Sequence, residues 1–503
     1  MIKRYIWLLF IIAFLPLAAD AQPYCNEWIS FSSNQQYSNQ QYFRVSVWKD
    51  GIYRISYNDL QNAGLPVSSL NPKQLQVFHQ GEEQFIHVEG EADGVFNQND
   101  YIEFYGRKND GSLDTRMYAD PLHQLNPSYS LITDTASYFL TINSNPLITN
   151  RRMVKETDVN FLGYTPLPYN MQVAFKGYDN FYNERNYAQV IDPSYSEGEG
   201  WTGPTFGNNG ATLPALPVPN ASTNPFAPQP VAETIVMGAN NNPQASITVE
   251  VNGATSTTTY SAFAVNRFTM PISASSLSGG TATFKYTPGS SGTNLNTVPF
   301  IKVTYAHNWS FNGQSLAYQE FEVPGNLSIG KSMISMTNVN AASPRLYMMG
   351  GDTLKQVSMV NNSGTLQALI PTVGLDRNCF LTDTVYSTAT GNDLYITPVS
   401  TDPTRFARFI NYNFDPNGDY LIVSHPKIWT EAQQYSAYRA TSGYQPLLVD
   451  INELYDQFAY GIQQHPLAIR NFCDFAIDTF IVKPQHLFLI GKSVVTHFNR
   501  KIA

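Results

Sequence analysis

The stretch Asp419–Ser424, with the sequence Asp-Tyr-Leu-Ile-Val-Ser, decides the fold class of the C-terminal part of the chain. Its apolar residues follow one another without alternation, which is typical of a parallel strand covered on both faces. Two further apolar strands follow it, Pro446–Asp450 and His486–Ile490. Helices are predicted at 430–442, 451–458 and 466–480. The order strand, helix, strand, helix, helix, strand predicts the opening of a doubly wound α/β domain.

This α/β part is short, because it comprises only residues 415–503 and three strands. Doubly wound domains usually contain more strands and more residues than this. We therefore expect that the chain ends at Ala503 inside its last domain.

The residues before 415 predict a mainly β protein. Phe43, Val45 and Val47 alternate with Arg44, Ser46 and Trp48, and Asp50-Gly51 is a turn signal, so 43–56 predicts a β-hairpin. Strands rich in Thr, Val and Ser resume after 230, which favours a two-sheet β-sandwich. The predicted organisation is a signal peptide at 1–21, an N-terminal β-rich domain at 22–196, a Pro/Gly/Asn-rich loop or linker at 197–230, a β-sandwich at 231–410 and the α/β segment at 415–503.

Composition excludes several classes of protein. The 503 residues carry a formal net charge of -9, and charged residues make up 14% of the chain, against about 25% in an average protein. Aromatic residues are abundant instead, with 31 Tyr and 30 Phe, which argues against disorder. An acidic chain with few Lys and Arg lacks the basic face of a nucleic-acid binder. We therefore expect no nucleic-acid partner.

The first residues predict export. Lys3 and Arg4 form a basic start, an apolar run follows to Leu17, and Ala19-Asp20-Ala21 fits a cleavage site. The mature chain would begin at Gln22. Three cysteines remain, an odd number that allows at most one disulfide, and we expect independent and mostly buried thiols.

A set of motifs in the α/β segment is shared with a known family. The motifs are Asp419–Ser424, Tyr438-Arg439, Gly443, Val449–Phe458, Tyr460-Gly461, Pro466–Phe472 and Leu487–Gly491. At these positions the chain resembles the gingipain-type cysteine peptidases, a family of secreted bacterial proteins. The β-rich start is similar to the region before the peptidase in larger members, at Gly51–Ile55, Asn99–Gly106 and Tyr138–Thr141.

The resemblance implies a caspase-like fold and hydrolysis of peptide bonds by a Cys nucleophile with a His partner. It also implies export through the type IX secretion pathway. In the family, the His and the Cys follow strands that come after the segment matched by Leu487–Gly491, so we expect both beyond Ala503. No catalytic, cofactor-binding or metal-binding residue is therefore assigned in this chain. Lys492 stands where several members have an acidic residue.

Three residues of the α/β segment could suggest a catalytic dyad, namely Cys473, His465 and His497. Cys473 lies on a helical stripe with Ile469, Ala476 and Phe480, which favours a core thiol over a nucleophile. His465 precedes a proline and is interpreted as a loop residue before a helix. His497 lies in a polar stretch near the end of the chain. We reject all three as members of a dyad.

Other polar residues are explained by local structure. Asp450 ends a strand at the edge where α/β ligands bind, but it also stands three residues before Glu453, which favours a helix cap. Asp93, Asn97 and Asn99 fail the calcium-loop pattern and fit turn chemistry. A structural calcium site from separate loops stays open. Tyr-rich surfaces can bind glycans or peptides, but Tyr also favours strands.

The leading hypothesis is a part of an exported gingipain-like cysteine endopeptidase that acts on proteins or peptides and is inactive as this chain alone. Its second partner would be the secretion machinery of the outer membrane, and its location the extracellular space or the cell surface. One alternative is a secreted, non-catalytic β-sandwich protein for binding or adhesion. A further alternative is a sortase-like peptidase of type IX secretion.

Overall fold

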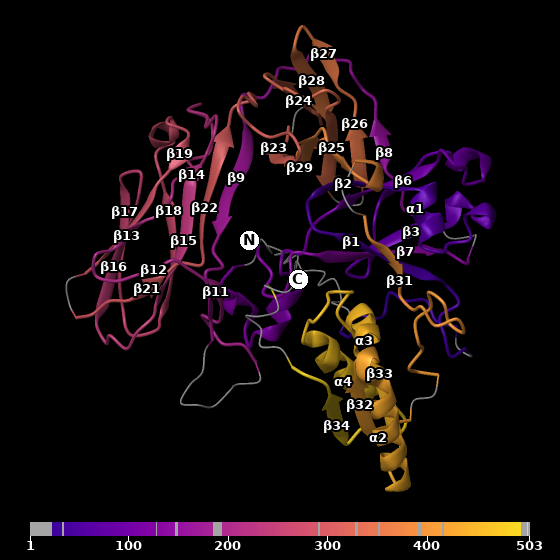
Figure 1. Cartoon of the computed structure of the whole chain (residues 1–503). Helices are drawn as coiled ribbons and strands as arrows, with labels where there is room; N and C mark the ends of the chain where they lie inside the picture. Colours follow the sequence, from indigo (N-terminus) through magenta and orange to yellow (C-terminus); the bar gives the residue numbers. More distant parts are fainter. Residues whose placement is uncertain are drawn as a thin grey trace, which may run out of the picture.

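The computed structural model describes residues 23–32, 35–126, 128–145, 149–184, 194–289, 292–326, 330–350, 353–390, 394–414, 417–493 and 500. In these residues the chain is mainly β, with one α/β segment at its C-terminal end (Figure 1). This confirms the predicted fold class. The predicted signal peptide at 1–21, His497 and Ala503 lie outside the described residues.

The N-terminal region is a sandwich of two sheets whose apolar side chains meet in one core. Val45 and Leu140 of one sheet pack in the same cluster as Ile55 and Phe104 of the other. The first sheet has the order β31 (Ile396–Pro398), β1 (Tyr42–Val47), β7 (Ala136–Ile142), β3 (Leu75–His79), β4 (Glu82–Glu83), and the second β30 (Val385–Tyr386), β2 (Gly51–Ser56), β6 (Tyr101–Gly106), β5 (Ile86–Val88). A short helix, α1 (Tyr57–Asn62), follows β2 and is capped by Ser56.

The hairpin predicted at 43–56 is wrong, although both strands form. β1 pairs with β7 and β31, whereas β2 pairs with β6 and β30. The turn at Asp50-Gly51 therefore carries the chain from one sheet of the sandwich to the other. Gly51 has φ 149, and a Cβ there would approach the Tyr386 ring to 2.7 Å, so the glycine is required for close packing at this crossing.

The middle of the chain forms a long sheet of 11 strands, and strands from both sides of 197–230 contribute to it. β9 (Asn170–Gly177) pairs along its whole length with β22 (Phe300–His307). The order is β12 (Thr205–Phe206), β21 (Asn296–Thr297), β15 (Val231–Gly238), β22, β9, β23 (Gln319–Val323), β29 (Arg377–Thr382), β25 (Arg345–Gly350), β26 (Thr353–Val357), β8 (Val154–Glu156), with β18 (Val265–Pro271) beside β15. The domain limits given above stay a prediction.

Smaller sheets cover this long sheet. Asn252-Gly253 forms the turn of a hairpin, because β16 (Ala245–Val251) and β17 (Ala254–Tyr260) pair around these two residues, both of which have positive φ. The smaller sheets are β13 (Ala211–Thr212), β20 (Phe284–Pro288), β16 (Ala245–Val251), β17 (Ala254–Tyr260); β24 (Ser332–Met336), β28 (Thr365–Ile370), β27 (Val360–Asn362); β10 (Phe181–Asn183), β11 (Gly200–Thr202); and β14 (Leu216–Pro217), β19 (Thr281–Ala282). The segment 197–230 thus contains short strands and is not a pure loop.

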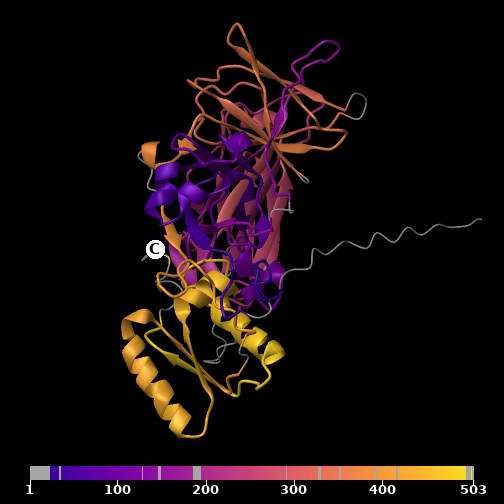
Figure 2. The same cartoon turned by 90° about the vertical axis from the view of Figure 1, so that its right-hand side faces the viewer.

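The α/β segment has the element order that the sequence predicts. Its three strands are parallel, in the order β33 (Pro446–Asp450), β32 (Tyr420–Ser424), β34 (His486–Ile490). Helix α2 (Trp429–Thr441) covers one face of the sheet, and α3 (Ile451–Phe458) and α4 (Leu467–Thr479) cover the other (Figure 2). Arg439 of α2 packs on the Tyr420 ring, whereas Leu421 and Val423 belong to the cluster that contains α3 and α4. Because β32 lies between two strands and two helix layers, all of its residues are buried.

The third strand differs from the buried strand that its apolar sequence suggests. Leu487, Phe488 and Leu489 of β34 are exposed to 45%, 41% and 54%. Among the described residues, β34 pairs with β32 alone and forms one edge of the sheet. Proteins normally protect an apolar edge strand, for example by covering it with a helix, a loop or a further strand.

One apolar cluster joins the α/β segment to the β regions, and we call it the interface core. Phe458 and Phe472 of the helices pack in it with Trp201 of β11 and with Leu113 and Met117 of a short 3-10 helix, η4 (Leu113–Met117). Burial of this apolar surface favours docking by roughly 25 cal/mol per Å². The α/β segment therefore packs directly on the β regions through an apolar interface.

Helix α3 adds buried ion pairs to this interface. Asp456 lies 2.6 Å from Arg44 of β1, and only 3% of its side chain is exposed. Glu453 accepts hydrogen bonds from Arg405, from the Ile410 N–H and from Gln457. Burial raises the pKa of both carboxyl groups, and the neighbouring guanidinium groups oppose this shift. These acids therefore depend on their arginines for charge compensation.

None of the helices in the described part of the chain is long and apolar enough to cross a membrane.

We predict that Asp456→Ala destabilises the docked structure by about 3 kcal/mol, because it leaves a largely buried guanidinium without its carboxylate. Urea unfolding followed by tryptophan fluorescence measures the loss. The control is Glu233→Ala, which removes an ion pair of similar length, 2.7 Å to Lys302, whose side chains are each 33% exposed. The control should lose under ~1 kcal/mol. Equal losses in both variants would contradict the role given to Asp456.

Candidate functional site

The carboxyl edge of the parallel sheet is the candidate functional site. In register, Ser424 of β32 lies opposite Asp450 of β33 and Ile490 of β34, so the ends of all three strands meet there. In open parallel sheets, ligands bind outside these carboxyl ends. The next residues along the chain are His425, Ile451 and Gly491. The edge therefore carries the polar side chains of Ser424, His425 and Asp450.

The polar side chains at this edge have structural partners. Asp450 caps α3, because its Oδ1 accepts a hydrogen bond of 2.9 Å from the Asn452 N–H, as the sequence predicts. Burial raises the pKa of Asp450. The Ser424 hydroxyl donates to the Ile490 carbonyl at 3.3 Å, and Nδ1 of His425 accepts from the Lys427 N–H at 3.1 Å. This edge therefore holds a helix cap and turn contacts, and no nucleophile is paired with a base there in the described residues.

The three cysteines are free thiols that lie away from this edge. Cys379 is fully buried in the long sheet, and burial raises its pKa strongly. Cys473 lies on α4, partly buried against the interface core, and burial raises its pKa to about 11. A thiol of this kind is protonated at neutral pH and is a poor nucleophile. The position of Cys473 agrees with the core role predicted for it.

His465 is more than a loop residue before a helix, because it is completely buried and paired with an acid from the β regions. Its Nε2 donates to Oδ1 of Asp114 at 2.9 Å, and its Nδ1 accepts from the Leu467 N–H at 3.2 Å. Asp114 also accepts from the Leu131 N–H and the Ser130 hydroxyl. Both ring nitrogens are used, so His465 has none left to act as a base. Its function is to fix the start of α4 on η4.

Residues 23–29, the first that the structure describes, form a strap across the interface. The Cys25 thiol is buried, and it accepts from Arg116 at 3.0 Å and from Asn471 of α4 at 3.4 Å. Burial raises its pKa. Tyr24 donates to Asp478 of α4, and the Trp28 ring packs on Tyr42 and Phe139 of the first sheet. The strap thus binds the α/β segment and the N-terminal sandwich at the same time.

No group of three or more His, Cys, Asp and Glu side chains in the described residues is placed to hold a metal ion. In the loop 93–99, Asp93 accepts from the Val95 N–H at 2.9 Å and from the Asn97 side chain at 3.2 Å. These are the turn contacts predicted for Asp93 and Asn97. Asn99 is exposed beside them, and Lys492 is exposed after Gly491.

The partners of the interface could not be found from local patterns. Asp114 and His465 lie 351 positions apart, and Arg44 and Asp456 lie 412 positions apart. A buried carboxylate needs a cation or several hydrogen-bond donors. The acids on the inner face of α3 therefore indicate that such partners exist. That signal predicts the existence of partners and not their identity.

We predict slow alkylation of Cys473 in the folded protein. With a pKa of about 11 against about 8.5 for a free thiol, the fraction of thiolate at pH 8 falls by roughly two orders of magnitude. Mass spectrometry after iodoacetamide treatment, with and without urea, measures the rate at each cysteine. The folded rate should rise about tenfold per pH unit up to pH 10. A fast, pH-independent rate at Cys473 near pH 7 would contradict the core role.

We predict that His465→Ala costs about 3 kcal/mol, because Asp114 would keep its charge in a site from which water is excluded. The double variant His465→Ala with Asp114→Ala should recover part of that loss, since no unpaired acid remains. Urea unfolding of the parent, of His465→Ala and Asp114→Ala alone and of the double variant measures the coupling. Strictly additive losses would show that the pair does not join α4 to η4.

Comparison with known proteins finds a family match for the α/β segment. Residues 413–502, which contain the complete three-stranded parallel sheet, match the family model described as Peptidase family C25. No curated protein matches the sequence. The family match therefore falls on the part of the chain that carries the candidate edge.

Solved structures extend the likeness to the β regions. Dimeric latent PorU from Porphyromonas gingivalis is similar over 94% of this chain and 43% of its own length, with a TM-score of 0.60 and 15% identity. This chain spans less than half of that protein, and the likeness concerns the fold. A cycloalternan-forming enzyme from Listeria monocytogenes covers 54% of this chain and 20% of its own length at 10% identity, with a TM-score of 0.16 that carries no argument. On residues 413–502 the chain is thus similar to Peptidase family C25, and in its overall fold it is similar to PorU.

Proposed function

We propose that this chain is part of an exported gingipain-like cysteine endopeptidase, in which the β regions carry and position a C25-type catalytic domain. The observation that supports this most is the family match over 413–502, which falls on the sheet β33-β32-β34 and its helices. The interface core, the strap and the α3 ion pairs hold this sheet rigidly on the β regions. Rigid support is what a catalytic edge needs, because the reacting groups must be positioned closely.

In this proposal the family's His and Cys come from chain segments that follow β34. Two observations support that placement. Cys25 and Cys379 are buried, and Cys473 is partly buried with a raised pKa, so the described thiols are unsuited to attack. The open edge and exposed apolar side chains of β34 are suited to pairing with a further strand of the same sheet. The sheet would then have the size and the double cover of a caspase-like domain.

The chemistry would be thiolate attack on the peptide carbonyl. The His would take the thiol proton as a base, and later give a proton to the leaving amine as an acid. The substrate would be a protein or peptide, and the acidic composition gives no surface for nucleic acid. Export by a cleaved signal peptide at 1–21, passage through the type IX machinery of the outer membrane and a place at or beyond the cell surface belong to the same proposal.

A second candidate is a sortase-like peptidase of type IX secretion. It is favoured by the extent of the PorU likeness, which includes the β regions as well as the α/β segment. The two candidates differ in the acceptor: an endopeptidase transfers the acyl group to water, and a sortase transfers it to an amine. Mass spectrometry of the products, with and without an added amine nucleophile, separates them.

The test compares two products of the same gene: residues 22–503, and the whole reading frame that contains them. We expect no peptide cleavage from residues 22–503, and cleavage from the whole product that iodoacetamide abolishes. Alkylator-sensitive turnover by residues 22–503 would contradict the placement of the Cys after β34. A reading frame that supplies no further Cys and His would favour the non-catalytic binding protein.

The matched control is the whole product with Cys25→Ser, Cys379→Ser and Cys473→Ser together. Because none of these thiols is proposed as the nucleophile, the triple variant should keep its kcat and remain sensitive to iodoacetamide. Since Cys25 and Cys379 are buried, circular dichroism must first show that the triple variant is folded. Loss of kcat in a folded variant would contradict the assignment.

A further inference from the structure

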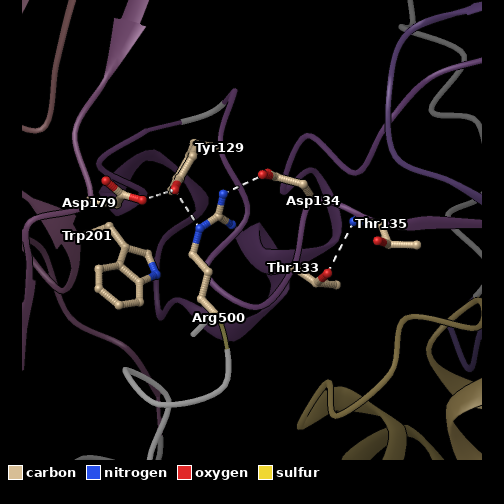
Figure 3. Close-up of a pocket in the computed structure, with 7 residues that line it drawn as sticks. All are labelled: Tyr129, Thr133, Asp134, Thr135, Asp179, Trp201 and Arg500. Atoms are coloured by element: carbon tan, nitrogen blue, oxygen red, sulfur yellow. Dashed lines mark hydrogen bonds and ion pairs between the residues drawn. The ribbon is translucent and has the colours of Figure 1, made fainter. Parts of the chain in front are cut away.

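A pocket of about 280 Å³ is lined mainly by residues of the β regions and holds an arginine side chain. Figure 3 shows Arg500 between Tyr129 and Trp201, with its guanidinium beside Asp134. The side chain of Arg500 is only 8% exposed. The pocket is therefore a place where the protein takes a cation out of water.

Every nitrogen of this guanidinium has an acceptor in one short loop. Nε donates to the Tyr129 hydroxyl at 2.5 Å, one terminal nitrogen donates to the Ser130 carbonyl at 2.5 Å, and the other donates to Asp134 Oδ1 at 2.7 Å. The central carbon lies 3.5 Å from the centre of the Tyr129 ring. A stacking face and a separate acceptor for each nitrogen match the planar fork of arginine and not the point charge of lysine.

A second acid sets the direction of one of these bonds. The Tyr129 hydroxyl donates to Asp179 Oδ2 at 2.6 Å (Figure 3). A hydroxyl has one proton, so this donation leaves its lone pairs free to accept from Nε of Arg500. Asp179 thus prepares Tyr129 as an acceptor without touching the guanidinium.

The charge balance of the pocket requires a cation. Its lining contains two carboxylates, Asp134 and Asp179, and Arg500 is the one basic residue among the seven that line it. Without Arg500 the pocket would keep two acids, an electron-rich ring face and a carbonyl. These groups would attract a guanidinium from elsewhere.

We propose that Tyr129, Ser130, Asp134 and Asp179 form a guanidinium-binding site that recognises an arginine side chain. In this structure the ligand is Arg500 of the same chain, and an arginine of a separate peptide would bind where Arg500 is absent. The site lies in the β regions and does not depend on the proposed peptidase activity.

The test is calorimetric titration of N-acetyl-arginine amide into the protein and into its Arg500→Ala variant. Arg500→Ala should bind the arginine amide at least ~10-fold more tightly than the parent, whose site is filled by its own arginine. N-acetyl-lysine amide should bind this variant at least ~10-fold more weakly, because it lacks the planar fork. Adding Asp134→Asn to the variant should remove the binding.

The matched control adds Asp474→Asn to Arg500→Ala, because Asp474 is an exposed acid of α4 that does not line the pocket. It should bind the arginine amide like Arg500→Ala alone. Equal affinity of the parent and Arg500→Ala would show that Arg500 does not fill the site. Equal affinity for the arginine and lysine amides would show a general cation site. Either result overturns the proposal, and circular dichroism confirms that each variant is folded.

Discussion

The burial of acidic side chains of α3 against arginines of the β regions is the constraint on which the arrangement of the molecule depends. A buried carboxylate is tolerated where a cation and hydrogen-bond donors surround it, so Glu453 and Asp456 permit one docking position for the helix. Apolar packing alone is less selective, because it depends on area and shape. The ion pairs therefore determine the docking position of α3, and the interface core provides most of the stability of the interface.

The strap and Gly461 provide further contacts that fix this docking position. The Ser137 hydroxyl donates to the Gly461 carbonyl at 2.9 Å, and Gly461 has φ 78. A Cβ at this position would come within 2.5 Å of Ser137, so the backbone of the loop after α3 touches β7 directly. The carboxyl edge of the parallel sheet, which is the candidate functional site, is thus fixed relative to the N-terminal sandwich. The guanidinium site at Tyr129 belongs to the same face of the β regions, since Leu131 enters the interface core.

The sequence predicts those features that depend on neighbours along the chain. The three parallel strands are visible because strands covered on both faces need continuous apolar residues, and the Asn252-Gly253 turn is visible because it needs two residues with positive φ. The alternation at 43–56 predicts two strands correctly but not their partners, because alternation is the same in a hairpin and across a sandwich. The partner of His465 is equally hidden, since nothing near His465 specifies Asp114. Of the candidate site, the cap at Asp450 was predictable from its spacing, whereas the exposure of β34 depends on what lies beside the strand in space.

The position of Cys25 has a consequence for the order in which the protein folds. Its thiol and the Asn471 side chain are 446 positions apart, so this part of the interface cannot close until the chain has been synthesised past residue 471. Closing so long a loop is entropically unfavourable and slow, and the N-terminal sandwich can form long before it. The strap is therefore among the last parts to reach its place, and until then the apolar surface of the β regions must be kept from aggregation. Residues 23–29 thus leave the ribosome early and are among the last to be buried.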